Sequence, residues 1–174
     1  SEDNFFFPLE ISKLCNKKSV VIQAGGHVGL YATHYSKIFS KVYTFEPEDI
    51  NYSCLLENTK NIENIISFNQ CIGDENKKVS LDINVKNTGN HSISFSKDNG
   101  KLIDCVTIDS LNLDSLDLLH LDLEGYEYFA LLGAKQTIKT YKPVIVLEKN
   151  KSIKKYNYKF SKIETFLKEL NYNV

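Results

Sequence analysis

The stretch from residue 20 to residue 31 constrains the fold of this 174-residue chain more than any other part of it. It begins with an apolar run, which is typical of a strand buried on both faces. Three glycines follow, and residues 30–39 then have the pattern of an amphipathic helix. A strand that turns on glycine into a helix points backbone N–H groups into open space and lets a ligand approach the main chain. The stretch therefore predicts a ligand-binding strand–turn–helix unit.

A second apolar run, at residues 42–45, ends in Glu46 and Pro47. In a Rossmann-like unit, an acidic side chain at the end of the second strand binds ribose hydroxyls. The alternatives for Glu46 are a solvated acid at a strand end or a cap for the following helix. The glycines alone are weak evidence for a Rossmann-like site. Combined with the strand before them, the helix after them and the acid at the next strand end, they favour a Rossmann-like site.

The rest of the chain alternates between strand and helix patterns. Residues 86–100 are rich in turn residues and are expected to form a long loop over the rim of the sheet. This alternation predicts an α/β, Rossmann-like fold with a mostly parallel central sheet and helices on both faces, in a single domain of residues 1–174. We expect an anchor segment at 1–18 with a helix at 9–16, helices at 48–60, 126–141 and 160–170, and strands at 65–69, 78–85, 102–108, 116–123, 143–148 and from 172.

Two of these helices carry more specific expectations. In the helix at 48–60, the apolar residues Ile50, Leu55 and Leu56 are the candidates for the inner face. In the helix at 126–141, Gly133 predicts a break, because glycine is a poor helix former.

Composition excludes several classes of protein. The 21 basic and 22 acidic residues nearly cancel, so no global field attracts nucleic acid or a membrane surface. No run of 18 apolar residues is present, and the acidic start does not resemble a signal peptide. The four cysteines are widely spaced, in neither a zinc pattern nor a disulfide framework. We therefore expect reduced thiols in a cytoplasmic protein that does not cross a membrane.

Glycines and polar residues follow several of the predicted strands directly. In parallel α/β sheets, ligands bind outside the carboxyl ends of the strands, so residues at those positions should meet at one rim. The residues expected there are Gly25, Gly26, Gly29, Glu46, Gln70, Cys71, Ile72, Asp122, Glu124 and Glu148.

In their order along the chain, these motifs resemble the FkbM-type family of class I S-adenosylmethionine-dependent methyltransferases. Residues 23–29 resemble the family's D-x-G-A-N-x-G motif, residues 45–47 match F-E-P, and residues 120–127 resemble K-I-D-x-E-G-x-E. L-x-G-A at 131–134 and P-x-x-x-x-E at 143–148 extend the resemblance to most of the chain. It implies S-adenosyl-L-methionine as cofactor and, usually, methyl transfer to a hydroxyl oxygen of a small molecule or a glycan.

This chain departs from the family pattern at three positions. Gln23 stands where the family has an Asp that braces the glycine turn, His27 replaces Asn and His120 replaces Lys. In addition, we expect the closing β-hairpin of the fold to be truncated, because the sequence ends as a further strand begins. Either the sequence is a trimmed piece of a longer protein, or a partner chain, or a second copy in a homo-oligomer, covers the exposed edge of the sheet.

The resemblance also implies how the cofactor is held. Glu46 would bind the ribose, residues 70–72 would lie beside the adenine, and the glycine turn would leave room for the methionine part. The complete set of expected cofactor-binding residues is Gln23, Ala24, Gly25, Gly26, His27, Gly29, Glu46, Pro47, Gln70, Cys71, Ile72 and Asp122.

An alcohol that accepts a methyl group must lose its proton, so we expect a base near the acceptor. Asp122 is the first candidate because it ends the central strand, although it could instead cap a helix or bind loop amides. Glu124, His120 and Glu148 are the further catalytic candidates. Their alternatives are a helix cap, a buried hydrogen-bonded histidine and a strand-end carboxylate. His91, in the long loop, could close over the rim.

Other uses of these residues stay open. Asp122, Glu124 and Glu148 could hold magnesium, as in catechol-type methyltransferases, but they show no telling ligand spacing, and we predict no metal. The segment 149–162 has six lysines interleaved with aromatic residues, which would suit a nucleic acid but is more often a solvated surface. The alternative functions are therefore an RNA-directed ribose 2'-O-methyltransferase and a cofactor-binding pseudoenzyme or interaction module.

Overall fold

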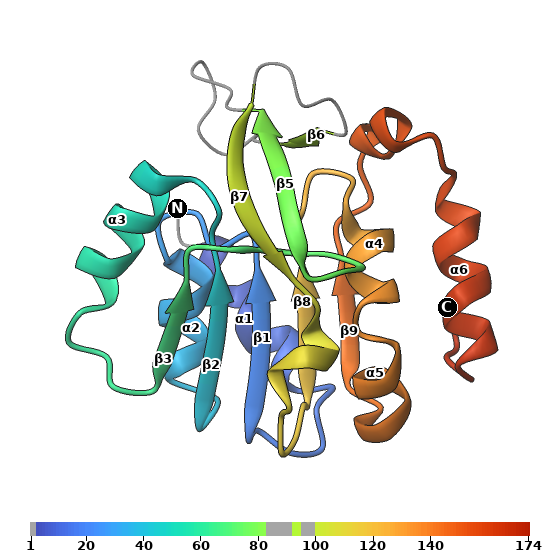
Figure 1. The fold of residues 1–174 in the computed structure, drawn as a ribbon. Helices are drawn as coiled ribbons and strands as arrows, with labels where there is room; N and C mark the ends of the chain where they lie inside the picture. The colour runs from blue at the N-terminus through green and yellow to red at the C-terminus, as the bar shows by residue number, and fades with distance from the viewer. Residues whose placement is uncertain (1–2, 83–91, 95–99) are drawn as a thin grey trace.

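The structure, a computed structural model, describes residues 3–82, 92–94 and 100–174. It confirms the expected Rossmann-like α/β fold, with a five-stranded parallel sheet between helices. A smaller four-stranded sheet lies beyond the carboxyl ends of the central strands (Figure 1). None of the described helices is long and apolar enough to cross a membrane.

The central sheet has the strand order β3-β2-β1-β8-β9, and all its pairs are parallel. The chain builds outward from β1 in one direction and then returns to the other side of β1. This reversal creates a topological switch point between β1 and β8, where open α/β sheets form their ligand crevices. The strands are β1 Val20–Ala24, β2 Lys41–Phe45, β3 Ile65–Phe68, β8 Leu118–Leu121 and β9 Val144–Leu147.

Helices cover both faces because neighbouring residues of the buried strands point in opposite directions. On one face, Val21 and Leu118 pack with the side chains of α1 and α2. On the other face, Ile22 and Leu119 join a larger core with the helices that follow β8 and β9. The helices are α1 Asp3–Ser12, α2 Leu30–Ser36, α3 Asp49–Thr59, η1 Ile108–Leu111, α4 Glu127–Leu132, α5 Lys135–Tyr141, η2 Lys151–Tyr156 and α6 Phe160–Glu169.

Helix α3 has a different inner face from the one its apolar residues predicted. Ile50 and Leu56 are 71% and 44% exposed, so their assignment to the inner face was wrong, whereas Leu55 is buried as expected. The other inner residues are the polar Asn51 and Thr59, which lie four residues to either side of Leu55. The inner face is partly polar because Asn51 lies beside the buried Glu46 carboxyl and hydrogen-bonds to it.

The second sheet was not foreseen as a separate layer. Its strands are β4 Cys71–Ile72, β5 Lys77–Asp82, β6 Ser92–Ser94 and β7 Lys101–Val106, in the order β4-β7-β5-β6. Strands were expected near β5 and β7, but these two pair antiparallel with each other and outside the central sheet. Strand β6 falls within the predicted loop at 86–100, so that prediction was wrong there, because a three-residue strand has too short an alternation to show among turn residues.

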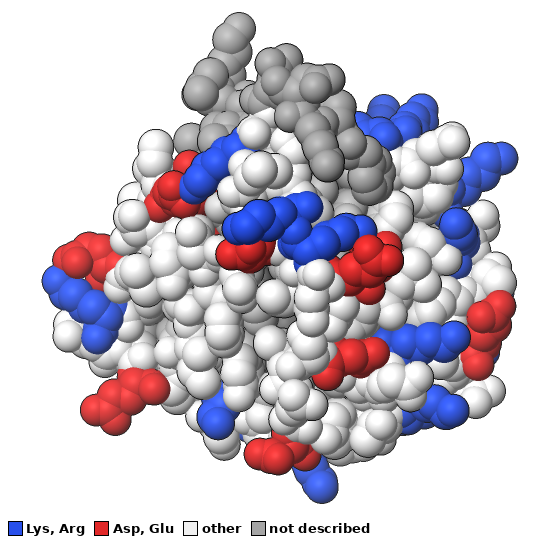
Figure 2. All heavy atoms as spheres, viewed as in Figure 1, with Lys and Arg blue, Asp and Glu red and all other residues white. Residues whose placement is uncertain are grey.

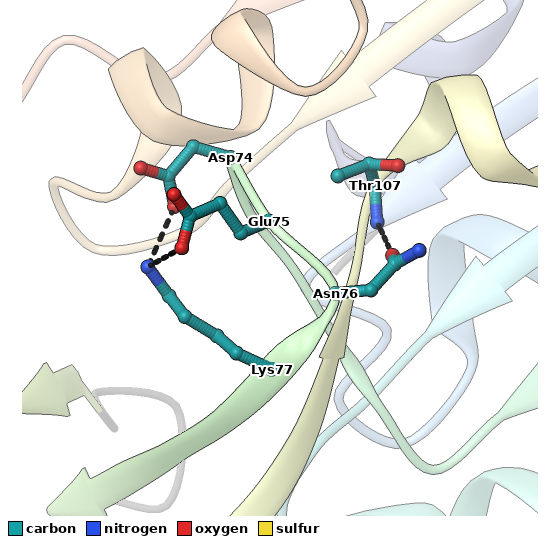
Figure 3. Close-up of polar contacts among 5 residues, drawn as sticks. All are labelled: Asp74, Glu75, Asn76, Lys77 and Thr107. Atoms are coloured by element: carbon teal, nitrogen blue, oxygen red, sulfur yellow. Dashed lines mark hydrogen bonds and ion pairs between the residues drawn. The ribbon is translucent and has the colours of Figure 1, made fainter.

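Polar contacts fix the turn that enters β5. Asn76 accepts a hydrogen bond through Oδ1 from the Thr107 backbone N–H at 2.8 Å, which ties the turn to the end of β7. Lys77 forms ion pairs with Asp74 at 3.1 Å and Glu75 at 3.3 Å (Figure 3). These contacts hold the start of β5 against the end of β7.

Two further expectations concern the second half of the chain. The break near Gly133 is confirmed, since α4 ends at Leu132 and α5 begins at Lys135. Residues 172–174 form no strand, which corrects the expectation of a further strand there. The Tyr172 hydroxyl donates instead to the Pro143 carbonyl at 2.8 Å, because α6 brings this end of the chain against the start of β9. Among the described strands, β9 is at an edge of the central sheet.

Candidate functional site

A cavity of about 240 Å³ lies at the carboxyl ends of β1, β2 and β8. The central sheet supplies its floor, and Leu81 of β5 and Ile93 of β6 line it from the second sheet. These two residues are cross-strand partners, so they form one continuous apolar wall. The predicted site residues that line the cavity are Gly25, Gly26, His27, Glu46, Pro47, Gln70, Cys71, Ile72, Asp122 and Glu124.

The turn after β1 is held tightly between β2 and β8. The backbone N–H groups of Gly25 and Gly26 both donate to the Phe45 carbonyl, at 3.1 and 2.8 Å. Gly25 has a φ of 89°, and a Cβ atom there would lie 2.0 Å from the Asp122 carbonyl oxygen. Only glycine allows both this conformation and this close approach of two chain segments.

Gln23 lies beneath the turn and is not part of the cavity lining. Its side chain is completely buried. It donates through Nε2 to the Gly25 carbonyl at 2.8 Å and accepts from the Thr44 hydroxyl at 2.8 Å. A carboxylate could not donate to that carbonyl, so the amide braces the turn in a different way from the Asp of the family motif.

Glu46 follows β2 and is 5% exposed. Its two carboxylate oxygens accept from the backbone N–H groups of His27, at 2.7 Å, and Glu48, at 2.9 Å. Burial raises the pKa of Glu46 to about 7, although these hydrogen bonds act in the opposite direction. With Asn51 as a third donor, the carboxylate keeps one spare lone pair, with which it can accept a hydrogen bond from a ligand hydroxyl. The contact between Asn51 and Glu46 was not predicted from the sequence. The only signal for it is a polar residue on a helix face that is buried.

Three carboxylates gather at the end of β8 and β9. Asp122, Glu124 and Glu148 each offer one oxygen, and these oxygens lie within 4.8 Å of one another. Burial, together with the charge of Glu148 and its hydrogen bond, raises the pKa of Asp122 to about 7. Such a group can hold a divalent cation or keep a proton between its members.

Residues that the sequence analysis did not assign hold this cluster in place. Asn150 and Ser152 donate to Glu124 Oε2 at 3.3 and 3.1 Å, and Asn150 also donates to Glu148. The buried Glu127 accepts from the backbone N–H groups of Leu123, at 2.9 Å, and of Gly125, at 3.2 Å. The sequence signal for Glu127 was present, because it ends the E-G-x-E part of the third motif.

His120 lies on the face of the central sheet that α1 and α2 cover, and it does not line the cavity. Its Nδ1 is 3.0 Å from the Tyr35 hydroxyl, and its ring packs against Phe7 and Tyr31. Burial lowers its pKa to about 4. This placement favours a neutral, structural histidine. Tyr31, which was not predicted, does line the cavity, and burial with the charges of Asp122 and Glu148 raises its pKa.

The remaining predicted residues lie close to the cavity. Ala24, Gly29 and Glu148 are not among its lining residues. The Ala24 carbonyl accepts from the Asp122 N–H at 3.0 Å, and Gly29 caps the start of α2 with a φ of 89°. His91 and most of the expected loop at 86–100 lie outside the described residues.

The sheet order and the cavity at the switch point define a Rossmann-like fold of the class I methyltransferase type. A family model, the methyltransferase FkbM domain, matches residues 23–174. The chain therefore belongs to the FkbM methyltransferase family, as the motifs indicated.

Two solved structures are similar in fold. A methyltransferase FkbM from Methylobacillus flagellatus KT has a TM-score of 0.56 and 21% identity, over 75% of this chain and 32% of that chain. A SAM-dependent methyltransferase from Aquifex aeolicus has a TM-score of 0.52 and 11% identity, over 96% of this chain and 80% of that one. This chain thus spans about a third of the length of the Methylobacillus protein. A comparison with curated proteins gave no match.

Family membership implies S-adenosyl-L-methionine as the methyl donor. Independently of the family match, the residues that line the cavity are suited to such a molecule. The buried carboxylate of Glu46 keeps a spare lone pair that can accept a hydrogen bond from a ribose hydroxyl. Cys71, Ile72 and Leu81 give an apolar wall suited to a flat base, and the turn at Gly25 brings backbone close to the cavity.

Proposed function

We propose that this protein is an S-adenosylmethionine-dependent O-methyltransferase that methylates a hydroxyl of a small molecule or a glycan. One observation carries the proposal: Glu46 and Asp122 line the same cavity at the switch point of the sheet. The first is suited to bind a ribose. The second, with its pKa raised to about 7, is suited to accept a proton near neutral pH.

In this proposal, different residues of the cavity bind different parts of the cofactor. Glu46 accepts a hydrogen bond from a ribose hydroxyl, residues 70–72 with Leu81 contact the adenine, and the turn at Gly25 leaves space for the methionine part. The bound cofactor supplies an electrophilic methyl group on its sulfonium sulfur. Because displacement at that methyl needs an in-line acceptor, the main task of the protein is to position the two reactants.

Asp122 is proposed as the base that takes the proton from the acceptor hydroxyl. The nearby Glu148 and Glu124 disfavour a further negative charge, which raises the proton affinity of Asp122. Asn150 and Ser152 fix Glu124, and Asn150 also fixes Glu148, so the cluster is preorganised before an acceptor arrives. Glu148 therefore acts through Asp122 in this proposal, while His120 has a structural role.

The two other functions suggested by the sequence have less support. Base stacking on the aromatic residues of the segment 149–162 would favour an RNA acceptor, but Tyr156 and Tyr158 are only 7% and 9% exposed. One signal for a pseudoenzyme was the replacement at Gln23. That side chain braces the turn through its own hydrogen bonds, so the turn is held in place despite this departure. A cytoplasmic location and a partner chain at the sheet edge stay predictions.

Calorimetric titration with S-adenosylmethionine and S-adenosylhomocysteine tests the cofactor part of the proposal. A mass-spectrometric screen for the gain of one methyl group, across sugars, small alcohols and RNAs, tests the reaction. Saturable binding together with a methylated hydroxyl would support the enzyme. Binding without any methylated product would favour the pseudoenzyme, and no binding at millimolar ligand would remove both.

A further inference from the structure

The segment from Lys149 to Lys162 contains six lysines and no acidic residue. Because the whole chain has a formal net charge of −1, the remainder of the protein is negatively charged. All six lysines are exposed. We call them the lysine surface: Lys149, Lys151, Lys154, Lys155, Lys159 and Lys162.

In the part of the chain that the structure describes, no acidic residue forms an ion pair with the lysine surface, because the ion pairs of lysine there involve residues outside this segment. Lys149 and Lys162 lie over the rings of Phe160, at 4.4 Å, and Tyr128, at 4.6 Å, and neither contact removes their charge. Figure 2 shows blue side chains at the upper right of the molecule, over η2 and the start of α6. Unpaired charges of one sign on one surface suit a partner with several negative groups.

This surface adjoins the cavity. Asn150 and Ser152, which lie between its lysines in the sequence, hydrogen-bond to Glu124 on the cavity wall. The backbone of Ser152 also packs so closely on Gly125 that a Cβ atom there would lie 2.6 Å from the Ser152 carbonyl carbon. A chain-like ligand held by the lysines would therefore run beside the carboxylate cluster.

The neighbouring side chains narrow the choice of partner. Proteins that bind single-stranded nucleic acid combine positive charge with exposed aromatic rings for base stacking. Here Tyr156 and Tyr158 are buried, and Lys149 lies over the ring of Phe160. Helices that lie on membranes insert an apolar face, but the apolar residues of α6, such as Phe166, pack into the core. Lysine ammonium groups alone are suited to phosphate, sulfate or carboxylate groups.

We propose that the lysine surface binds an anionic glycan, a sugar chain bearing phosphate, sulfate or carboxylate groups, and presents one of its hydroxyls to the cavity. The presentation step rests on the proposed O-methyltransferase function, whereas the binding step does not. The proposal therefore narrows the acceptor from any hydroxyl compound to a negatively charged carbohydrate.

The test measures binding of a heparin decasaccharide, a size-defined anionic glycan, by calorimetry at low and moderate salt. One variant changes Lys151, Lys154, Lys155 and Lys159 to Gln. It leaves Lys149 and Lys162 intact, because their contacts with aromatic rings contribute to packing. A matched control changes four exposed lysines near the amino ends of the central strands to Gln: Lys17, Lys18, Lys37 and Lys139.

We expect the wild-type protein to bind the decasaccharide, with affinity that falls steeply as salt is raised, and not to bind neutral maltodecaose. The variant in the lysine surface should bind about tenfold more weakly, and the control variant about as tightly as the wild type. Binding of S-adenosylmethionine should be unchanged in both, since none of these lysines lines the cavity. If the wild-type protein binds the decasaccharide but not S-adenosylmethionine, the proposed function is rejected, whereas the binding of an anionic glycan to the lysine surface still stands.

Four results would overturn the proposal. An equal loss in the two variants would mean that only net charge matters. Tighter binding of a single-stranded RNA 20-mer than of the decasaccharide would assign the surface to nucleic acid. If the protein does not bind the decasaccharide, an anionic glycan is not the partner. The same conclusion holds if the protein binds only to vesicles containing phosphatidylglycerol.

Discussion

At the scale of single residues, the carboxylate of Glu46 both holds backbone in place and is available to a ligand in the cavity. It fixes the turn after β1 and the start of α3 by accepting two backbone N–H groups, and it faces the cavity. Those two hydrogen bonds orient the carboxylate before a ligand is present. A ribose would therefore meet a group that needs no reorganisation, which is the condition for strong charge-assisted hydrogen bonds.

Replacement of Glu46 should weaken cofactor binding. For Glu46→Ala we expect a loss of tenfold or more in affinity for S-adenosylmethionine, because charge-assisted hydrogen bonds contribute about 1.5–3 kcal/mol. Calorimetric titration provides the measurement, with thermal unfolding beside it to report the loss of the two backbone contacts. Glu48→Gln is the matched control, since Glu48 is also buried and caps α3 but does not line the cavity. Equal losses of affinity in the two variants would contradict a ribose site at Glu46.

Asp122 makes the stability of the fold depend on pH. Its pKa is raised from 3.8 to about 7 by burial and by Glu148, with smaller contributions from Glu124 and Glu127. The folded state therefore binds more protons than the unfolded state between these values. The free energy of unfolding should thus fall as pH rises from about 4 through 7.

Urea unfolding at pH 5 and pH 8 tests this dependence. The neutral amide of Asp122→Asn cannot titrate, so the decline between the two pH values should be smaller than in the wild type by about 1–2 kcal/mol. The exposed residue Asp114 serves as the control, and Asp114→Asn should keep the decline of the wild type. An unchanged decline in Asp122→Asn would show that Asp122 is ionised in the folded protein at pH 5.

At the scale of elements, the turn after β1 and the loop after β8 form one unit. We expect Gly25→Ala to abolish cofactor binding, because its Cβ atom would lie 2.0 Å from the Asp122 carbonyl oxygen and force the two elements apart. Gly29 has the same φ of 89°, but in Gly29→Ala the nearest atoms to the Cβ atom would be side-chain carbons of Thr59 and Leu55, at 3.2 and 3.3 Å, and the Leu55 Cα would lie at 3.6 Å. Gly29→Ala should thus lower the melting temperature while retaining measurable binding in the same titration. Retained binding in Gly25→Ala would contradict the coupling of the two elements.

The elements also show what the sequence could predict. Strand β1, its glycine turn and the acid after β2 were predictable because each depends on a local pattern of residues. The polar inner face of α3 was not, because Asn51 is buried through its contact with Glu46, which belongs to another element. For His120, a buried, hydrogen-bonded side chain was one of the two expected roles. That it is covered by Phe7 and Tyr35 depends on contacts distant in sequence.

At the scale of the whole molecule, the cavity belongs to two sheets at once. The central sheet supplies the glycine turn and the carboxylates, and the second sheet supplies the apolar wall of Leu81 and Ile93. The sequence predicted the first contribution because consecutive parallel strands all end at the same rim. It placed Cys71 and Ile72, which form β4 of the second sheet, at the site. It did not predict the wall of Leu81 and Ile93, because the pairing of β5 with the three-residue β6 leaves almost no periodic signal.

If the second sheet shapes the cavity, shortening one of its wall residues should affect binding and stability together. Leu81→Ala should cost about 2–4 kcal/mol of unfolding free energy, because Leu81 is 1% exposed and its loss leaves a hole. It should also weaken S-adenosylmethionine binding about tenfold, since the same side chain lines the cavity. Val79→Ala is the matched control: Val79 lies two residues away on β5 and is buried, but it is not part of the lining. Val79→Ala should lower the free energy of unfolding in urea and leave the affinity for S-adenosylmethionine unchanged. A similar loss of that affinity in Val79→Ala would mean that the second sheet acts only by stabilising the fold.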